Sequence, residues 1–113
     1  MWTADQQRRM VLVESTRPVC TGDDDCRAKW EAAQLWITHN AAMKLQTVTN
    51  VVIETYNPIN DTPGFAAQAT KEPLGDGRYR IVLHLRCGNL FGCNHDPVAA
   101  VQNFNDTVAA ARP

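Results

Sequence analysis

Four cysteines in two pairs of identical spacing constrain this chain more than any other feature of its sequence. Five residues separate Cys20 from Cys26, and five separate Cys87 from Cys93. Common zinc sites place paired ligands two to four residues apart, and thioredoxin-like redox motifs leave two residues between their cysteines. An even count at a repeated spacing instead favours a disulfide framework. We predict the pairs Cys20–Cys26 and Cys87–Cys93, one of three possible connectivities, because each pair flanks one turn region.

The length and charge of the chain restrict its architecture and its partners. Its 113 residues suffice for one compact domain and are too few for two independent cores. Eleven basic against twelve acidic residues give a formal net charge of −1, which provides no general attraction toward nucleic acid. No apolar run approaches the roughly 18 residues that cross a bilayer. We therefore expect a single domain over residues 1–113, with no nucleic-acid partner, no membrane span, no metal and no cofactor.

The N-terminal segment 1–18 is compatible with either a helix or a strand. Thr3 and Gln6 have the spacing of a capping box, in which a hydroxyl and an amide side chain bond the free N–H groups of a helix start. The run Met10–Val13 is apolar and partly β-branched, which also suits a short strand. Of the two, a helix over Ala4–Glu14 is favoured.

Two further helices are indicated by their start signals. Three aspartates at 23–25 precede good helix formers, and carboxylates stabilise the positive end of a helix. These aspartates predict a long helix over 26–43. Near the C-terminus, Asp96 can cap a further helix and Pro97 suits its first position, so we expect that helix over 96–110.

The central segment 46–87 predicts a three-stranded antiparallel meander. Residues 46–56 are rich in β-branched side chains, and a weaker strand follows over 65–71 and stops at Pro73. Residues 78–87 alternate apolar with mainly polar side chains, as in a sheet with one buried and one solvated face. The predicted fold is α+β in the order α-α-β-β-β-α, with two or three helices packed on one face of the sheet.

The apolar stripe of each element predicts a shared core. Its expected members are Trp30, Ile37, Ile53, Ile81, Leu83 and Phe104.

The polar face of the last strand is a candidate anion-binding surface. Four basic side chains share this face at alternate positions, namely Arg78, Arg80, His84 and Arg86. The ordinary alternative is a solvated sheet face on which Glu54 and Glu72 of the other strands pair with these arginines, if the strand register allows it.

A second hypothesis is a small enzyme or a metal-binding protein. Thiolates of reduced Cys87 and Cys93 and the imidazoles of His84 and His95 are zinc ligands by residue type, but their spacing departs from familiar sites. The sequence contains no serine in a nucleophile elbow and no glycine-rich phosphate loop before a helix. An enzyme is therefore the minority interpretation, and no catalytic residue is assigned.

The cysteine pattern resembles that of uncharacterised small exported proteins of proteobacteria. The resemblance rests on the segment Cys20-Thr-Gly-Asp-Asp-Asp-Cys26, on Lys29-Trp30 and Trp36, and on the span from Cys87 to Cys93, and it covers residues 17–104. It implies a periplasmic or secreted location and a signal peptide that has been removed. It implies no activity, because such proteins have no established one.

From these features we predict a non-enzymatic binding or accessory domain of the bacterial cell envelope, with an envelope protein as its partner. The loop 88–92 carries Leu90 and Phe91, two apolar residues between the second pair of cysteines. Apolar residues on a closed loop form a candidate binding surface, so we predict that these two contact the partner.

Overall fold

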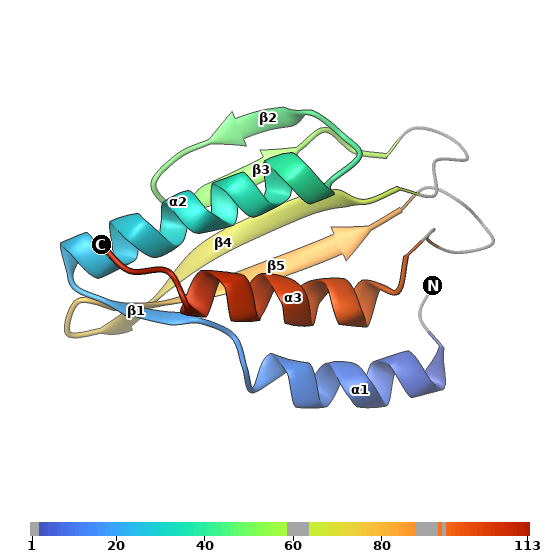
Figure 1. The fold of residues 1–113 in the computed structure, drawn as a ribbon, viewed down its shortest axis with the longest axis horizontal. Coiled ribbons are helices and arrows are strands. Elements are labelled where there is room, and N and C mark those ends of the chain that lie inside the picture. Colours follow the sequence, from blue (N-terminus) through green and yellow to red (C-terminus); the bar gives the residue numbers. More distant parts are fainter. Residues whose placement is uncertain (1–2, 59–63, 88–92, 94) are drawn as a thin grey trace.

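The computed structural model describes residues 3–58, 64–87, 93 and 95–113. In this part of the chain the elements are α1 (Ala4–Glu14), β1 (Val19–Thr21), α2 (Asp23–Asn40), β2 (Leu45–Val48), β3 (Val52–Thr55), β4 (Ala66–Gly75), β5 (Arg78–Arg86) and α3 (Pro97–Ala109). The strands form one sheet in the order β1-β5-β4-β3-β2, and all neighbouring strands are antiparallel (Figure 1). The α+β class is confirmed, whereas the sheet has five described strands rather than the predicted three.

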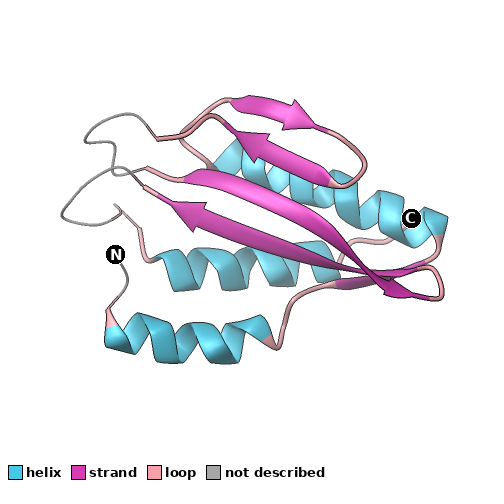
Figure 2. Cartoon of the chain, turned by 180° about the vertical axis from the view of Figure 1, so that it is seen from behind, coloured by secondary structure: helices cyan, strands magenta, loops and turns pink. Residues whose placement is uncertain are grey.

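The three helices lie on one side of the sheet: α2 and α3 lie over its face, whereas α1 packs against α3 beyond the strands (Figure 1). Helices α2 and α3 lie side by side (Figure 1). From behind, the sheet stands in front of the helices and its second face is uncovered (Figure 2). The prediction that helices cover only one face is therefore confirmed. No helix in the described ranges is both long enough and apolar enough to cross a membrane.

Helices α1 and α3 begin at the caps that the sequence predicts. The Thr3 side chain accepts a hydrogen bond from the Gln6 N–H at 3.1 Å, and the Gln6 side chain accepts one from the Thr3 N–H at 2.9 Å. This capping box makes the ambiguous N-terminal segment a helix. At the start of α3 the Asp96 carboxylate accepts from the Val98 N–H at 2.9 Å, with Pro97 in the first turn.

Helix α2 is shifted toward the N-terminus relative to its predicted bounds of 26–43. It begins at Asp23, so the three aspartates occupy its first turn instead of preceding it, where the helix dipole still favours their charge. It ends at Asn40 because Ala41 is extended and the Ala42 N–H donates to the Phe65 carbonyl at 2.8 Å. A contact with a distant segment therefore ends the helix three residues earlier than its own sequence predicts.

The predicted strand over 46–56 is two strands joined by a turn. Strands β2 and β3 flank residues 49–51, where the Thr49 Oγ1 accepts from the Val51 N–H at 3.2 Å and from the Val52 N–H at 3.0 Å. The Thr49 N–H also donates to the Val52 carbonyl. Threonine is favourable in strands and can also close a turn through its hydroxyl, so composition alone does not reveal the hairpin.

Strand β4 continues through Pro73, where the sequence predicts a stop. The Lys71 N–H donates to the Val51 carbonyl on the β3 side of β4, and the nitrogen of Pro73, two residues on, points toward the same side. The described pairing of β3 with β4 extends only to Thr70. Pro73 lacks an N–H, but β3 does not pair with β4 at this position, so no hydrogen bond of the sheet is lost.

Strand β1 is the element that the sequence did not predict. Its three residues pair with β5, with Cys20 opposite Tyr79, and the Ile81 N–H donates to the Pro18 carbonyl. Three residues are too few to show a periodic pattern, so the strand is defined by its partner.

The predicted core is confirmed in all six positions. These residues are between 0% and 8% exposed, and they pack with side chains from all three helices. The rings of Trp36 and Phe104 meet edge to face at a centroid distance of 5.3 Å. One position departs from the expected pattern: Val82 is on the uncovered face, opposite Thr70, yet it is only 2% exposed.

Candidate functional site

Both predicted disulfides are present. Cys20 on β1 joins Cys26 in the first turn of α2, and Cys87 at the end of β5 joins Cys93 shortly before α3. Cys20 and Cys26 are 0% and 4% exposed, so this bridge is enclosed in the protein. It connects a strand at the edge of the sheet to the longest helix, which is a structural role. The described part of the chain contains no free cysteine.

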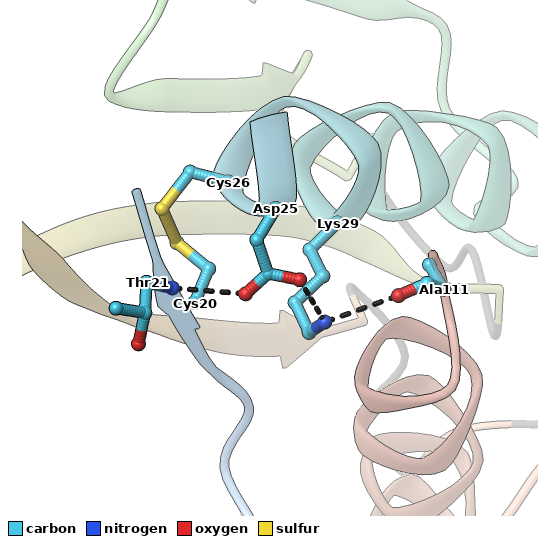
Figure 3. The surroundings of a disulfide bond; sticks show 6 residues. All are labelled: Cys20, Thr21, Asp25, Cys26, Lys29 and Ala111. Carbon is cyan, nitrogen blue, oxygen red and sulfur yellow. Dashed lines mark hydrogen bonds and ion pairs between the residues drawn. A yellow bond between two sulfur atoms is a disulfide. The ribbon is translucent and has the colours of Figure 1, made fainter. Parts of the chain in front are cut away.

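An ion pair lies beside the first disulfide and joins three segments (Figure 3). The Lys29 Nζ donates to the Asp25 Oδ1 at 2.6 Å and to the Ala111 carbonyl at 3.0 Å. The Thr21 N–H donates to the second carboxylate oxygen of Asp25 at 2.9 Å. The hydrogen bond from Lys29, and then that from Thr21, lower the pKa of Asp25. These contacts tie α2 to the end of β1 and to the C-terminal segment.

The residues of the metal-binding hypothesis do not form a joint site in the described ranges. Cys87 and Cys93 are oxidised, so neither provides a thiolate ligand. His84 is on the uncovered face of β5, opposite Gln68, whereas the ring of His95 lies 6.4 Å from that of the core residue Phe65. Among the residues that can be placed, no three His, Cys, Asp or Glu side chains are grouped to hold a metal ion.

The four candidate anion-binding residues do share one surface. All four are exposed at alternate positions of β5, on the face of the sheet that carries no helix (Figure 2). We call this surface the basic face, defined by Arg78, Arg80, His84 and Arg86.

The partners of the basic face differ from those that the sequence predicts. Glu54 is bound by the amide of Gln68, whose Nε2 donates to its Oε2 at 3.0 Å. The residue opposite Gln68 on β5 is His84, so these three side chains form a row across β3, β4 and β5. A hollow of about 90 Å³ lies along this row. The Arg86 guanidinium donates to the neutral side chain of Asn57.

The ion pairs in the described part of the chain lie in the helices and the residues flanking them. Their cations are Arg8, Arg9, Arg17, Arg27 and Lys29. No carboxylate of the described residues lies within 4.0 Å of the guanidinium groups of the basic face, although Glu72 is directly opposite Arg80 in the strand register. The expected pairing with Glu54 and Glu72 is therefore absent from this surface.

The other candidate surface, Leu90 and Phe91, lies outside the described residues, and its role stays a prediction.

Sequence reasoning missed two concave surfaces on the helical side. A depression of about 490 Å³ between α2 and α3 has the buried rings of Trp36 and Phe65 at its base and His39 and His95 at its rim. A groove of about 600 Å³ lies between α2 and the β2–β3 turn. Each combines residues from elements far apart in the sequence, so no local motif marks it.

No family model, no curated protein and no solved structure matches this chain.

Proposed function

We propose that this protein is a non-enzymatic binding domain of the bacterial cell envelope that holds an acidic protein segment on its basic face. The observation that carries the proposal is the set of three exposed arginines, Arg78, Arg80 and Arg86, with no carboxylate within 4.0 Å among the described residues. By contrast, five cations in or beside the helices each have a carboxylate within 4.0 Å. Guanidinium groups without a carboxylate beside them favour an external anion, and the one side-chain partner of Arg86, Asn57, is neutral.

The spacing of the basic face suits an extended acidic chain. Alternate residues of a strand are about 6.8 Å apart, so Arg78 and Arg80, and then His84 and Arg86, follow one line along β5 at that repeat. An extended polypeptide has the same repeat, and alternate glutamates or aspartates on it match the arginine positions. Each exposed pair contributes only about 0.2–1 kcal/mol, so the interaction depends on several pairs acting together and on low salt.

The compartment is inferred from the disulfides and from the resemblance to exported proteins. Two disulfides are compatible with an oxidising environment, and such bonds are rare in the reducing cytosol of mesophilic cells. The periplasm or the extracellular space provides that environment. The rival hypothesis of a small enzyme or a metal-binding protein loses support, because its cysteines form a disulfide and its two histidines lie beside different neighbours.

A titration with a labelled glutamate-rich peptide tests this function. Fluorescence anisotropy should report binding to the wild-type protein at an ionic strength of about 0.01 M and weaker binding at about 0.15 M. The variant Arg78→Gln/Arg80→Gln/Arg86→Gln should lose this binding. A matched control, Arg8→Gln/Arg17→Gln/Arg27→Gln, removes the same charge from the helices and the residues beside them, and this variant should retain most of the binding.

Two outcomes would contradict the proposal. If both triple variants lose affinity equally, the peptide responds only to net charge and the basic face has no special role. If the basic-face variant binds like wild type, the acidic segment docks elsewhere.

A further inference from the structure

The groove between α2 and the β2–β3 turn contains a lysine that the basic face does not include. Lys71 is directly opposite Ile81 in the β4–β5 register, so its side chain is on the covered face of the sheet, opposite to the basic face. Its Nζ lies 5.3 Å from the centroid of the Trp30 ring and 5.4 Å from that of Tyr79. Two aromatic rings therefore hold this ammonium at the groove by cation–π interaction.

The walls of the groove are held in place by hydrogen bonds. The Trp30 Nε1 donates to the Thr49 carbonyl at 2.8 Å, which fixes the indole against the turn. The Lys71 N–H donates to the Val51 carbonyl at 2.9 Å, which fixes β4 to the same turn. A ligand that enters the groove meets groups that are already ordered, so little conformational entropy is lost on binding.

The groove combines its cation with exposed apolar groups. Val48 and Val51 line it and are 46% and 51% exposed, although most valines of this chain are better buried. No carboxylate within the described ranges approaches the Lys71 ammonium to 4.0 Å. An ammonium beside an apolar wall is complementary to an anion that carries a hydrocarbon chain.

Carboxylates of α2 also line the groove, and they would favour a cationic ligand over an anionic one. Asp23 and Glu31 are exposed on its helical side, and Arg27 on the same side pairs with Asp24 at 3.3 Å. A cationic ligand would bind these carboxylates, whereas an anionic ligand would bind the ammonium that the rings hold. The position of Lys71 between two rings places it beside the apolar wall, which favours the anion.

We propose that this groove binds a carboxylate carried on a short apolar chain, with Lys71 as the anion-binding residue and Trp30, Val48 and Val51 as the apolar wall. The site is independent of the basic face, because the two lie on opposite sides of the sheet.

A titration of the ¹⁵N-labelled protein with three six-carbon probes tests the proposal. Hexanoate should produce saturable shifts of the Trp30 indole N–H and of the Val51 amide, whereas hexanol and hexylamine should bind more weakly. Lys71→Met keeps an apolar side chain of similar length and should weaken hexanoate binding about tenfold or more, since a charge-assisted hydrogen bond is lost. The control Lys44→Met removes the same charge at an exposed position and should bind hexanoate like wild type.

The proposal fails if hexanol binds wild type as tightly as hexanoate, because the carboxylate would then contribute nothing. It fails equally if hexylamine binds more tightly or if folded Lys71→Met keeps its hexanoate affinity. Should Lys71→Met not fold, the comparison of the three probes on wild type decides. The variant that lacks the basic-face arginines should still bind hexanoate, which separates this site from the proposed function.

Discussion

Lys29 and Asp25, one turn apart on α2, form an ion pair in which the ammonium is almost enclosed: Nζ lies 2.6 Å from the carboxylate oxygen, and the lysine side chain is 6% exposed. The carboxylate is 28% exposed and also accepts the Thr21 N–H. Asp25 is therefore more accessible to water than Lys29. This difference in exposure decides which substitution lowers the stability of the fold more.

Asp25→Asn should destabilise the protein more than Lys29→Met. The first change leaves an enclosed ammonium without its counter-charge, at a cost of about 1–3 kcal/mol in free energy of unfolding. The second leaves a carboxylate that still has the Thr21 N–H and solvent, so its cost is expected to be about 1 kcal/mol or less. Urea unfolding of both variants measures the difference, and the reverse order would show that the packing of Lys29 outweighs its charge.

Acid should weaken the fold through Asp25 and Asp96. The hydrogen bond from Lys29 lowers the pKa of Asp25, and that from Arg9 lowers the pKa of Asp96. A carboxyl with a lowered folded pKa stabilises the protein above its unfolded value, here 3.8, and this contribution disappears as the pH falls through the folded pKa. The urea midpoint should therefore fall in acid below about pH 5. In Asp25→Asn/Asp96→Asn the midpoint should start lower at neutral pH and decline less steeply.

The two disulfides should differ in their effect on stability and in their access to reductant. Both close loops of the same sequence separation, so the entropic contribution of each is about 2 kcal/mol. Cys20 and Cys26 are buried, whereas Cys87 and Cys93 are half-buried. Cys20→Ala/Cys26→Ala should therefore cost more in unfolding free energy than Cys87→Ala/Cys93→Ala. Mass mapping during mild reduction should find the second bridge opened first; simultaneous opening would contradict this order.

The core prediction is tested by one buried and one exposed aliphatic residue. Ile81 is fully buried, and its replacement by alanine should cost about 2–5 kcal/mol in unfolding free energy. Val11 is 67% exposed on α1, so Val11→Ala should change stability by less than about 0.5 kcal/mol. Denaturant unfolding of both variants measures this contrast, and equal effects would mean that the apolar face of β5 is not the one that packs against the helices.

Local signals in the sequence determined the starts of α1 and α3, the main strand and the disulfides. A capping box acts over three residues, a proline at the first turn acts on its own backbone, and each cysteine pair closes a loop within six positions. The alternation along β5 identified the side chains that face the helices, Ile81, Leu83 and Leu85, because strand geometry repeats every two residues. These features depend on residues close together in the chain, so they can be predicted from a single sequence.

Only the tertiary structure decided the features that depend on distant partners. Strand β1 exists through its pairing with β5, α2 ends where Ala42 bonds to Phe65, and Pro73 stays in β4 because β3 does not reach it. Two further features have the same origin: no carboxylate of the described residues lies beside the basic-face arginines, and Lys71 lies between two rings. Which side chains face one another across a sheet depends on register and turn geometry, which arise from contacts across the whole chain.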